Sequence, residues 1–531
     1  MLHNLSRDRE AIVTEVKSRI VEEIREKDSD RLLEVINDTL YQERERLRRH
    51  SHLYTNPGKD RSFYKRLSKG LGNLSDKQLM NVLGDLVHNY IDEIVGNFNR
   101  LMYGIATHAI PGGLTFMLNT MSPFRIFKNF PAIPSVDGTL LVSGRLDKLR
   151  RLKEKGGVLV HVPEHQSNLD SPVLGYSIYK AALPPVMYGA GYNLFQMPLF
   201  PFFMGKLGAY RVDRLKTSSL YKRILKEYAT VTLEFGYDHL FFPGGTRSRS
   251  GGIETRLKKG LLGTALKAYV SCRKQNKGKR FYIVPITVSY HLTLEASTLI
   301  EDYLKEKGKS RYIIIDDESS KPAVILNFMS RLISLEGRIH VHFCDPLDPF
   351  GNSVDDDGNS LDGRGRVVDI DGYITRDGRV VHDGQRDTVY TNELEKRIVA
   401  SYFDNTILLV THVAAHVMLR LLRKKSQSGD LFKFLREEST TGSVPSDEME
   451  AGLGSVLDQL RRMEREGRVK LEPALMQDGA FDVLMSALKY FGVYHRDPVI
   501  QRKGNRLFTR DPNLLYYYHN RLTGYDLEVA S

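Results

Sequence analysis

The apolar positions of the chain follow a helical period at both ends and form short strand-like runs in the middle. Residues 1–50, rich in Glu, Arg, Ile and Leu, have a helical pattern, and the segment 54–60 is predicted to be a loop. A helical pattern resumes at about Ser75, which is suited to cap a helix, and continues toward Tyr103. We therefore predict an N-terminal helical domain over residues 1–130.

Short apolar runs then alternate with helical segments. The expected strands are 158–162, 239–242, 281–290 and 338–343, and the expected helices are 145–155, 217–235 and 253–276. This order favours an α/β fold, with a mixed, largely parallel sheet flanked by helices. The pattern predicts that this core covers residues 131–350.

The segment 351–392 is crowded with Asp-Gly steps, which are typical of hairpin turns. The steps are Asp357-Gly358, Asp362-Gly363, Asp371-Gly372, Asp377-Gly378 and Asp383-Gly384. A calcium loop beginning at Asp355 would need Gly at its sixth position, where this chain has Ser360. We therefore predict a hairpin insertion over 351–392. A C-terminal helical region is predicted over 393–531, beginning with an apolar helical stretch at 393–424.

Two stretches, 101–124 and 181–205, contain no Asp, Glu, Lys or Arg. Each exceeds the ~20 residues that span a bilayer. Their prolines and glycines interrupt the backbone hydrogen bonding that a membrane span requires. Two interpretations stay open. The stretches are buried core or loop, or they form a surface rich in Met and Phe that contacts acyl chains or the membrane face.

The charge balance narrows the choice of partners. Lys and Arg number 77 against 65 Asp and Glu, a formal net charge of +12 in 531 residues. A basic surface suits phosphate-bearing ligands, acidic carrier proteins or anionic lipid, and no nucleic-acid motif is present. The two cysteines form neither a disulfide framework nor a zinc motif, so we expect a reducing compartment and no metal. The N-terminus lacks an apolar signal core, so we expect a cytoplasmic protein.

Candidate chemistry lies where the strand 158–162 ends. His165 follows Pro163, and Asp170 lies five positions further on, at a predicted helix start. A carboxylate placed there could hold one imidazole nitrogen while the other faces a cleft. A His held in this way can take a proton from a hydroxyl near neutral pH. The alternative is a purely structural hydrogen bond between the two residues.

Two later segments contain arginines. The segment 207–214 holds Arg211 and Arg214, and the segment 242–251 combines glycines and hydroxyls with two Arg. Glycines let backbone N–H groups approach an anion, and Arg forks match phosphate oxygens in pairs. A solvated loop is the alternative for 242–251. Because ligands bind at strand ends in such folds, the pattern indicates transfer to a hydroxyl of a phosphate-bearing substrate.

The segment from His165 to Asp170 resembles the HxxxxD block of the glycerolipid acyltransferases. The family order continues with an Arg block at 208–214, a Gly-Arg-Ser block at 244–251 and a Pro block at 284–290. SRSG at 248–251 and PITVSY at 285–290 are similar to the branch that acts on glycerol 3-phosphate and dihydroxyacetone phosphate. The tail at 514–522 is weakly similar to that of the large bacterial enzymes. The chain departs from the family at Gly244, where the family usually has Glu, and at Thr246, where it has Gly.

The resemblance implies specific roles. His165 would be the base and Asp170 its partner, and Pro285 would shape the site. The residues implied for the acceptor phosphate are Arg211, Gly245, Arg247, Ser248 and Arg249.

The implied reaction moves a fatty acyl group from acyl-CoA or acyl carrier protein to the sn-1 hydroxyl of glycerol 3-phosphate, without an acyl-enzyme or a cofactor. The product would be lysophosphatidate, the first intermediate of phospholipid synthesis. The alternatives are lysophosphatidate or dihydroxyacetone phosphate as acceptor, or a non-catalytic lipid- or phosphate-binding protein on the same fold. Association with the cytoplasmic face of an anionic membrane is also expected.

Overall fold

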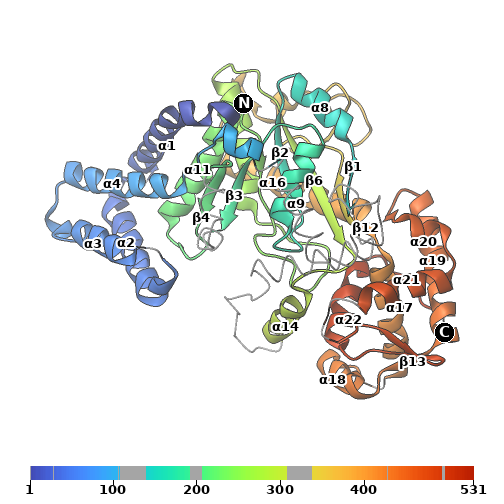
Figure 1. Ribbon diagram of the computed structural model, residues 1–531. Helices are drawn as coiled ribbons and strands as arrows, with labels where there is room; N and C mark the ends of the chain where they lie inside the picture. The colour runs from blue at the N-terminus through green and yellow to red at the C-terminus, as the bar shows by residue number, and fades with distance from the viewer. Residues whose placement is uncertain are drawn as a thin grey trace.

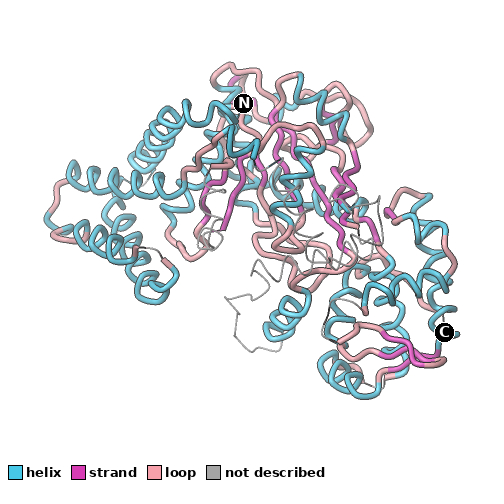
Figure 2. Tube along the Cα trace, viewed as in Figure 1, coloured by secondary structure: helices cyan, strands magenta, loops and turns pink. Residues whose placement is uncertain are grey.

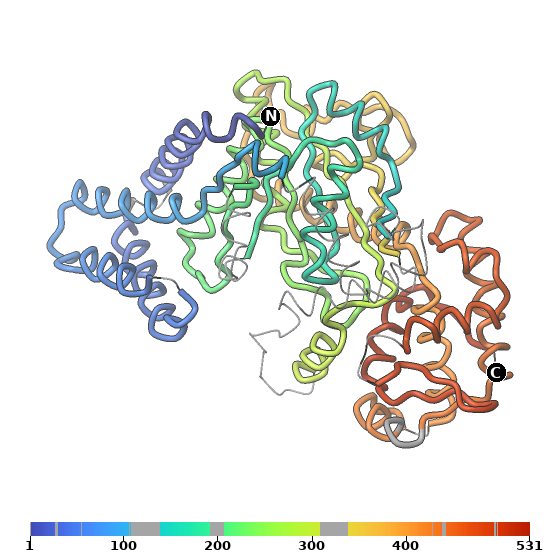
Figure 3. The backbone as a smooth tube through the Cα atoms, viewed as in Figure 1, coloured from blue at the N-terminus to red at the C-terminus, as the bar shows by residue number. Residues whose placement is uncertain are grey.

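The computed structural model describes residues 2–27, 29–54, 56–105, 107, 139–191, 206–307, 338–426, 428–492, 495 and 497–530. A group of N-terminal helices and a group of C-terminal helices lie on opposite sides of a central sheet (Figure 1). The backbone runs from the first group through the sheet to the second (Figure 3). The predicted N-terminal and C-terminal helical character is confirmed.

The N-terminal helices are α1 (Leu5–Lys27), α2 (Leu32–His50), α3 (Pro57–Leu67) and α4 (Asp76–Ile94). Short 3₁₀ turns accompany them at Leu2–Asn4, Ser29–Arg31, Ser51–Leu53 and Leu71–Asn73. Ser75 caps α4 as expected, in a capping box with Gln78. The loop expected at 54–60 is shorter than predicted, because Pro57 begins α3 at the position where a helix tolerates proline.

A seven-stranded sheet forms the core, in the order β1-β7-β6-β2-β5-β3-β4. Its strands are β1 (Leu140–Gly144), β2 (Val158–Pro163), β3 (Met187–Gly191), β4 (Ala209–Val212), β5 (His239–Leu240), β6 (Phe281–Tyr290) and β7 (Ile339–Phe343). Within this sheet, β6 and β7 pair antiparallel and the other neighbouring pairs are parallel. The prediction of a mixed, largely parallel sheet is therefore confirmed. Figure 2 shows strands of this sheet, in magenta, in the middle of the molecule.

The helices around the sheet are α8 (Leu146–Glu154), α9 (Asp170–Lys180), α11 (Ser219–Phe235), α12 (Lys259–Leu262), α13 (Thr264–Lys274), α14 (Ala296–Lys307) and α16 (Gly384–Asn405). The prediction of a single helix over 253–276 is wrong. Residues 253–258 form a loop, and the helical part is divided into α12 and α13 at Gly263. Asp170 lies at a helix start as predicted, since it is the first residue of α9, and Leu169 is the residue before that helix.

The second uncharged stretch is partly explained by β3. Met187 in this strand is fully buried, and Ala190 is also buried, so residues 187–191 belong to the sheet. Residues 192–205 and 108–124 lie outside the described residues. For those parts of the two stretches, both interpretations stay predictions.

The hairpin prediction for 351–392 is correct for two of its five steps. Asp357-Gly358 joins β8 (Ser353–Val354) to β9 (Ser360–Leu361), and Asp377-Gly378 joins β10 (Thr375–Arg376) to β11 (Arg379–Val380). The other three steps have different structures. Asp371-Gly372 lies in the 3₁₀ helix Ile370–Tyr373, and Asp383 caps α16 by accepting from the backbone N–H groups of Gln385 and Arg386. In the turn that begins at Asp362, the glycine with a positive φ is Gly365, and Gly363 is not in the left-handed region.

A seven-residue repeat underlies this segment. Asp348, Asp355 and Asp362 each accept, through one carboxylate oxygen, from the backbone N–H groups two and four residues further on. Three residues after each Asp, a glycine adopts a positive φ of 91°, 87° and 75° in turn. The Asp carboxylates are therefore used to close three successive turns.

The C-terminal helices are α17 (Val410–Lys425), α18 (Leu431–Thr441), α19 (Ser446–Arg465), α20 (Pro473–Gln477), α21 (Ala480–Phe491) and α22 (Pro512–His519), followed by the 3₁₀ turn Asn520–Leu522. Two small sheets accompany them. One contains β13 (Ser443–Pro445), β15 (Gln501–Lys503) and β16 (Arg506–Phe508), and the other contains β12 (Ile407–Leu408) and β14 (Lys470–Leu471). The helix predicted at 393–424 is interrupted, because β12 lies between α16 and α17.

Candidate active site

A histidine–aspartate pair lies just beyond the carboxyl end of β2. The Nδ1 atom of His165 lies 2.8 Å from Oδ2 of Asp170, the first residue of α9. Asp170 is fully buried. Its oxygens also accept from the Tyr290 hydroxyl at 2.6 Å and from the backbone N–H groups of Gln166 and Ser167 at 2.6 and 2.9 Å. These donors fix the carboxylate, so it can hold the imidazole in one orientation.

The surroundings of His165 favour its neutral form. The ring stacks on Phe242 with 4.0 Å between ring centroids, and 13% of the side chain is exposed. Burial lowers the pKa of His165 below its usual value, and Arg247 and Arg214 lower it further, against the opposing effect of Asp170. Near pH 7 the ring can therefore donate from Nδ1 to Asp170 and accept a proton at Nε2.

The Gly-Arg-Ser segment, 244–251, lies directly beside this pair. The backbone N–H of Ser248 donates to the backbone carbonyl of His165 at 2.6 Å, and its hydroxyl donates to the Gly252 carbonyl at 2.7 Å. Gly245 has a φ of +78°, and a Cβ there would also collide with the Lys258 side chain. The segment therefore forms a tight loop whose backbone is bonded to the base.

The two arginines of this loop have acidic neighbours. Arg247 lies 3.4 Å from the buried carboxylate of Glu295, and Arg249 lies 2.9 Å from Glu306 on α14. Glu295 also accepts from the Ser167 hydroxyl and the Asn168 backbone N–H. Glu295 thus links the His165 loop to Arg247. Arg249 is directed toward α14, so the structure separates the two arginines that the sequence grouped together.

The Arg block contributes Arg214 more directly than Arg211. Arg211 lies within β4, paired in register with Ala190, and is exposed. The charge of Arg214 lowers the pKa of His165. The pKa of Arg214 itself is lowered first by desolvation and then by the charge of Arg247, although much of the residue is exposed. Arg214 and Arg247 therefore form a cationic corner beside the neutral His165, and this corner suits an anion.

Pro285 supports the start of the His165 loop through the backbone. It lies in β6 opposite Val162 of β2, and the next residue, Ile286, accepts from the backbone N–H of Glu164 at 3.0 Å. Proline in a central strand lacks a donor, and β7 ends its pairing at Ile286. Pro285 thus lies beside the end of β2, and its own carbonyl accepts from the Cys344 backbone N–H at 3.0 Å.

The C-terminal tail contacts the same loop. Arg521 donates to both oxygens of Glu164 at 3.1 and 2.7 Å, and both side chains are almost fully buried. Burial opposes a charge on Arg521, but Glu164 outweighs it and raises the pKa of the guanidinium group. Asn520 donates to the Ser250 carbonyl at 2.9 Å, and a Cβ on Gly251 would lie 2.4 Å from the carbonyl oxygen of Tyr517. The tail therefore packs against both loops that surround His165.

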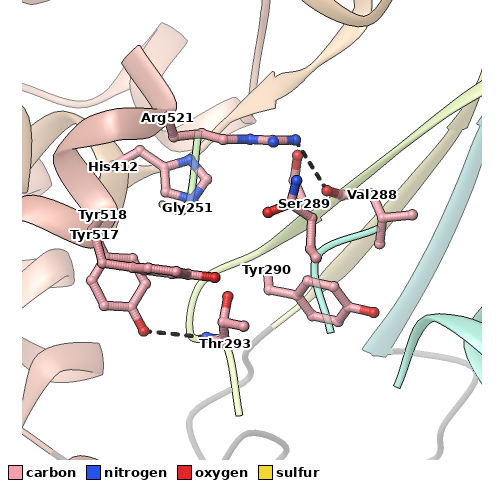
Figure 4. A pocket seen from close by; sticks show the side chains of 10 residues that line it. Gly251, Val288, Ser289, Tyr290, Thr293, His412, Tyr517, Tyr518 and Arg521 are labelled. Atoms are coloured by element: carbon pink, nitrogen blue, oxygen red, sulfur yellow. Dashed lines mark hydrogen bonds between the residues drawn. The ribbon is translucent and has the colours of Figure 1, made fainter. Parts of the chain in front are cut away.

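A small polar cavity separates the tail from β6. Figure 4 shows Arg521, His412 and Tyr517 on the tail side and Ser289 and Tyr290 on the strand side, with Arg521 bonded to the Val288 carbonyl at 3.2 Å. It has room for about one water molecule. Polar side chains, among them Ser289, His412 and Arg521, thus line the contact between the tail and β6.

Glu254, ten residues after Gly244, gives a pH-dependent prediction. Burial, and then the charge of Glu164, raise the pKa of Glu254 to about 8. The other charged or titratable groups near it are Asp170, Arg521 and Tyr402. Because the folded-state pKa lies above the unfolded value, the neutral carboxyl stabilises the fold at low pH, and this stabilisation is lost as the pH rises toward 8.

We therefore expect Glu254→Gln, which does not titrate, to gain stability relative to the wild type between pH 5 and pH 8. The relative gain should be on the order of 2–4 kcal/mol and level off above about pH 9. Denaturant unfolding of both proteins across this pH range measures it. A stability difference that stays constant from pH 5 to 9 would show that Glu254 ionises normally.

Sequence reasoning missed several of these residues. Glu164 and Phe242 stand inside or next to the segments that it singled out, but residue type alone did not indicate their contacts. Arg214 was named with Arg211, but the sequence did not indicate that its charge acts on His165. Arg521 stands in the tail 514–522, whose contact with Glu164 the sequence did not indicate, and Glu254 lies outside those segments.

A segment that contains most of the central sheet matches a known protein family. Residues 145–289 match the Acyltransferase family model. Glycerol-3-phosphate acyltransferases of Actinobacillus succinogenes and Pasteurella multocida are 32% and 30% identical to this chain over 203 residues. The alignments cover 38% of this chain and 23% of each relative, so the matched part spans about a quarter of those proteins.

A solved structure is also similar: the 1-acyl-sn-glycerophosphate acyltransferase PlsC of Thermotoga maritima. It is 14% identical, and the alignment covers 55% of this chain and 95% of that protein with a TM-score of 0.25. The matched residues 145–289 contain the sequence blocks at 165–170, 208–214 and 244–251. Residues 145–289 thus match the Acyltransferase family model, and the two curated relatives, similar to this chain over 203 residues, are named glycerol-3-phosphate acyltransferases.

Proposed function

We propose that this protein transfers a fatty acyl group from a thioester donor to the sn-1 hydroxyl of glycerol 3-phosphate. The observation that carries the proposal is the cationic corner at the end of β2. There a neutral His165, oriented by Asp170, lies within the electrostatic reach of Arg247 and Arg214. A hydroxyl on a phosphate-bearing molecule fits both parts of this site.

The chemistry follows from the orientation of His165. Its Nε2 accepts the proton of the acceptor hydroxyl while the oxygen attacks the thioester carbonyl carbon. The C–S bond then breaks, and the thiolate leaves with the proton returned by the imidazolium. Asp170 stabilises the imidazolium and does not itself need to be protonated. The transfer is direct, so no acyl-enzyme forms.

The loop 244–251 and Arg214 would hold the acceptor. Arg247 is the best placed of the proposed phosphate ligands, because Glu295 orients it beside the His165 loop. Ser248 and Gly245 shape the loop, while Arg211 and Arg249 would act at its edges. The net charge of +12 suits either acyl-CoA or an acidic acyl carrier protein as donor.

Arg247→Ala is expected to raise the KM for glycerol 3-phosphate by about 10- to 100-fold, with the KM for palmitoyl-CoA changed by less than about threefold. The variant loses a charge-assisted contact that only the phosphate makes. Steady-state kinetics with each substrate varied in turn measures the two values. Arg256→Ala, an exposed arginine in the following loop, 253–258, is the matched control and should leave both values unchanged. Equal increases in the two KM values in Arg247→Ala would count against a phosphate ligand.

An acceptor panel tests the proposed reaction. Thiol release from palmitoyl-CoA is followed with glycerol 3-phosphate, dihydroxyacetone phosphate, lysophosphatidate or glycerol in the assay. The proposal expects the highest kcat/KM for glycerol 3-phosphate and little turnover of glycerol. A preference for lysophosphatidate would move the protein to the next acylation step. Absence of turnover with every acceptor would indicate a binding protein.

We also infer peripheral attachment to an anionic membrane at the cytoplasmic face, which would deliver the acylated product directly to lipid. In the part of the chain that the structure describes, no helix combines the length and apolarity of a membrane span. We expect the protein to co-sediment with anionic liposomes at low salt and to be released by high salt, because salt screens surface charges. Neutral phosphatidylcholine liposomes are the control. Retention that only detergent reverses would mean an embedded segment.

A further inference from the structure

Gly244 and Glu254 compete for one space beside the His165 loop. A Cβ atom on Gly244 would lie 2.3 Å from Glu254 Oε2 and 2.4 Å from its Cδ, which is well inside contact distance. Gly244 is not among the glycines with positive φ, so its backbone conformation does not itself require glycine. The Glu254 carboxyl is therefore what excludes a side chain at position 244.

The carboxyl that fills this space is bonded to the loop of the base. Glu254 Oε1 accepts from the backbone N–H of His165 at 3.2 Å, and the backbone N–H of Glu254 donates to Glu164 Oε1 at 3.3 Å. Its other oxygen, Oε2, is buried and has no hydrogen-bonding partner among the described residues. Glu254 thus contacts two consecutive residues of the loop, one of which carries the imidazole.

This contact differs from the other bonds that hold the loop. Asp170 orients the imidazole ring, and Ser248 holds the carbonyl of His165, whereas Glu254 holds its N–H. Together the three residues fix the ring and both backbone polar groups of the same residue. Burial favours a neutral Glu254, which accepts this bond without adding a negative charge near the acceptor phosphate.

We propose that Glu254 is a positioning residue of the acyl-transfer site, which holds the His165 backbone from the space that Gly244 leaves open. The inference rests on the proposed function. Gly244 and Glu254 then act as a pair. Any side chain at this position displaces the carboxyl and loosens the base, even though Gly244 itself contacts no substrate.

A double-mutant cycle tests the pair. Glu254→Ala and Gly244→Ala are each expected to lower kcat by about 10- to 100-fold, since small displacements of a catalytic group have effects of this size. Both KM values should change by less than about threefold. In the Glu254→Ala background, Gly244→Ala should cause almost no further loss, because no carboxyl remains to be displaced. Glu254→Gln keeps an accepting oxygen. If Glu254→Ala lowers kcat 100-fold, Glu254→Gln should have at least ten times the kcat of Glu254→Ala.

Melting temperatures and a neighbouring control separate positioning from general damage. Thr255→Ala, an exposed residue next to Glu254, should keep the wild-type kcat. If Glu254→Ala does not fold, Gly244→Ala and Glu254→Gln still test the pair. Additive losses, or wild-type kcat in Glu254→Ala, would overturn the proposal. An inactive wild-type protein would instead overturn the proposed function, so the two failures are distinguishable.

Discussion

Replacing His165 with Ala is expected to lower kcat by ~10² to 10⁴, the range for a lost general base. In the part of the chain that the structure describes, the His165 ring donates to Asp170 and stacks on Phe242, so we expect the fold to survive its loss. Its backbone bonds to Ser248 and Glu254 survive the substitution. Steady-state kinetics and a melting curve measured together check the prediction.

Asp170→Asn provides the graded comparison. The amide keeps the shape of the carboxylate but loses the charge that stabilises an imidazolium, so the loss should be smaller than in His165→Ala. The lowered pKa of His165 also predicts that kcat/KM falls only at pH values below the usual pKa range of histidine. A His165→Ala protein with wild-type turnover and an unchanged melting curve would remove the base from the mechanism.

Arg521→Met is expected to have the largest effect on stability, a loss of about 3–5 kcal/mol. It removes one partner of a buried ion pair and leaves Glu164 charged and uncompensated beside the base. Because Glu164 precedes His165 directly, kcat should fall as well. Urea unfolding and kinetics of the same preparation measure the two effects.

The effect of Arg521→Met depends on the charge left behind. Glu164→Gln in the Arg521→Met background should recover part of the stability, since the remaining polar group is then neutral. Arg510→Met, at an exposed position of the same tail, is the matched control and should change stability by no more than about 0.5 kcal/mol. An Arg521→Met protein as stable as the wild type would show that the tail does not hold the catalytic loop.

The long apolar runs made the centre of the fold predictable. β2 and β6 are fully buried on both faces and were visible as continuous apolar runs. β3 and β4 were missed because their residues, among them Gly189, Gly191 and Arg211, are poor strand signals on their own. Pairing in the sheet, rather than local preference, makes them strands.

The site residues also differ in how far the sequence alone could predict their contacts. His165 and Asp170 are five residues apart at a strand end, so local geometry was enough to pair them. Arg521 and Glu164 are 357 residues apart, and no local pattern relates them. The preference for Arg214 over Arg211 depends on the charge of Arg214, just past the end of β4, acting on His165, which only the three-dimensional arrangement reveals.

The most direct test incubates purified protein with radiolabelled glycerol 3-phosphate and palmitoyl-CoA and resolves the product by thin-layer chromatography. His165→Ala serves as the blank. The account predicts labelled lysophosphatidate from the wild type and at least 100-fold less from the variant. Equal labelled product from both proteins, or none from the wild type at any substrate concentration, would contradict it.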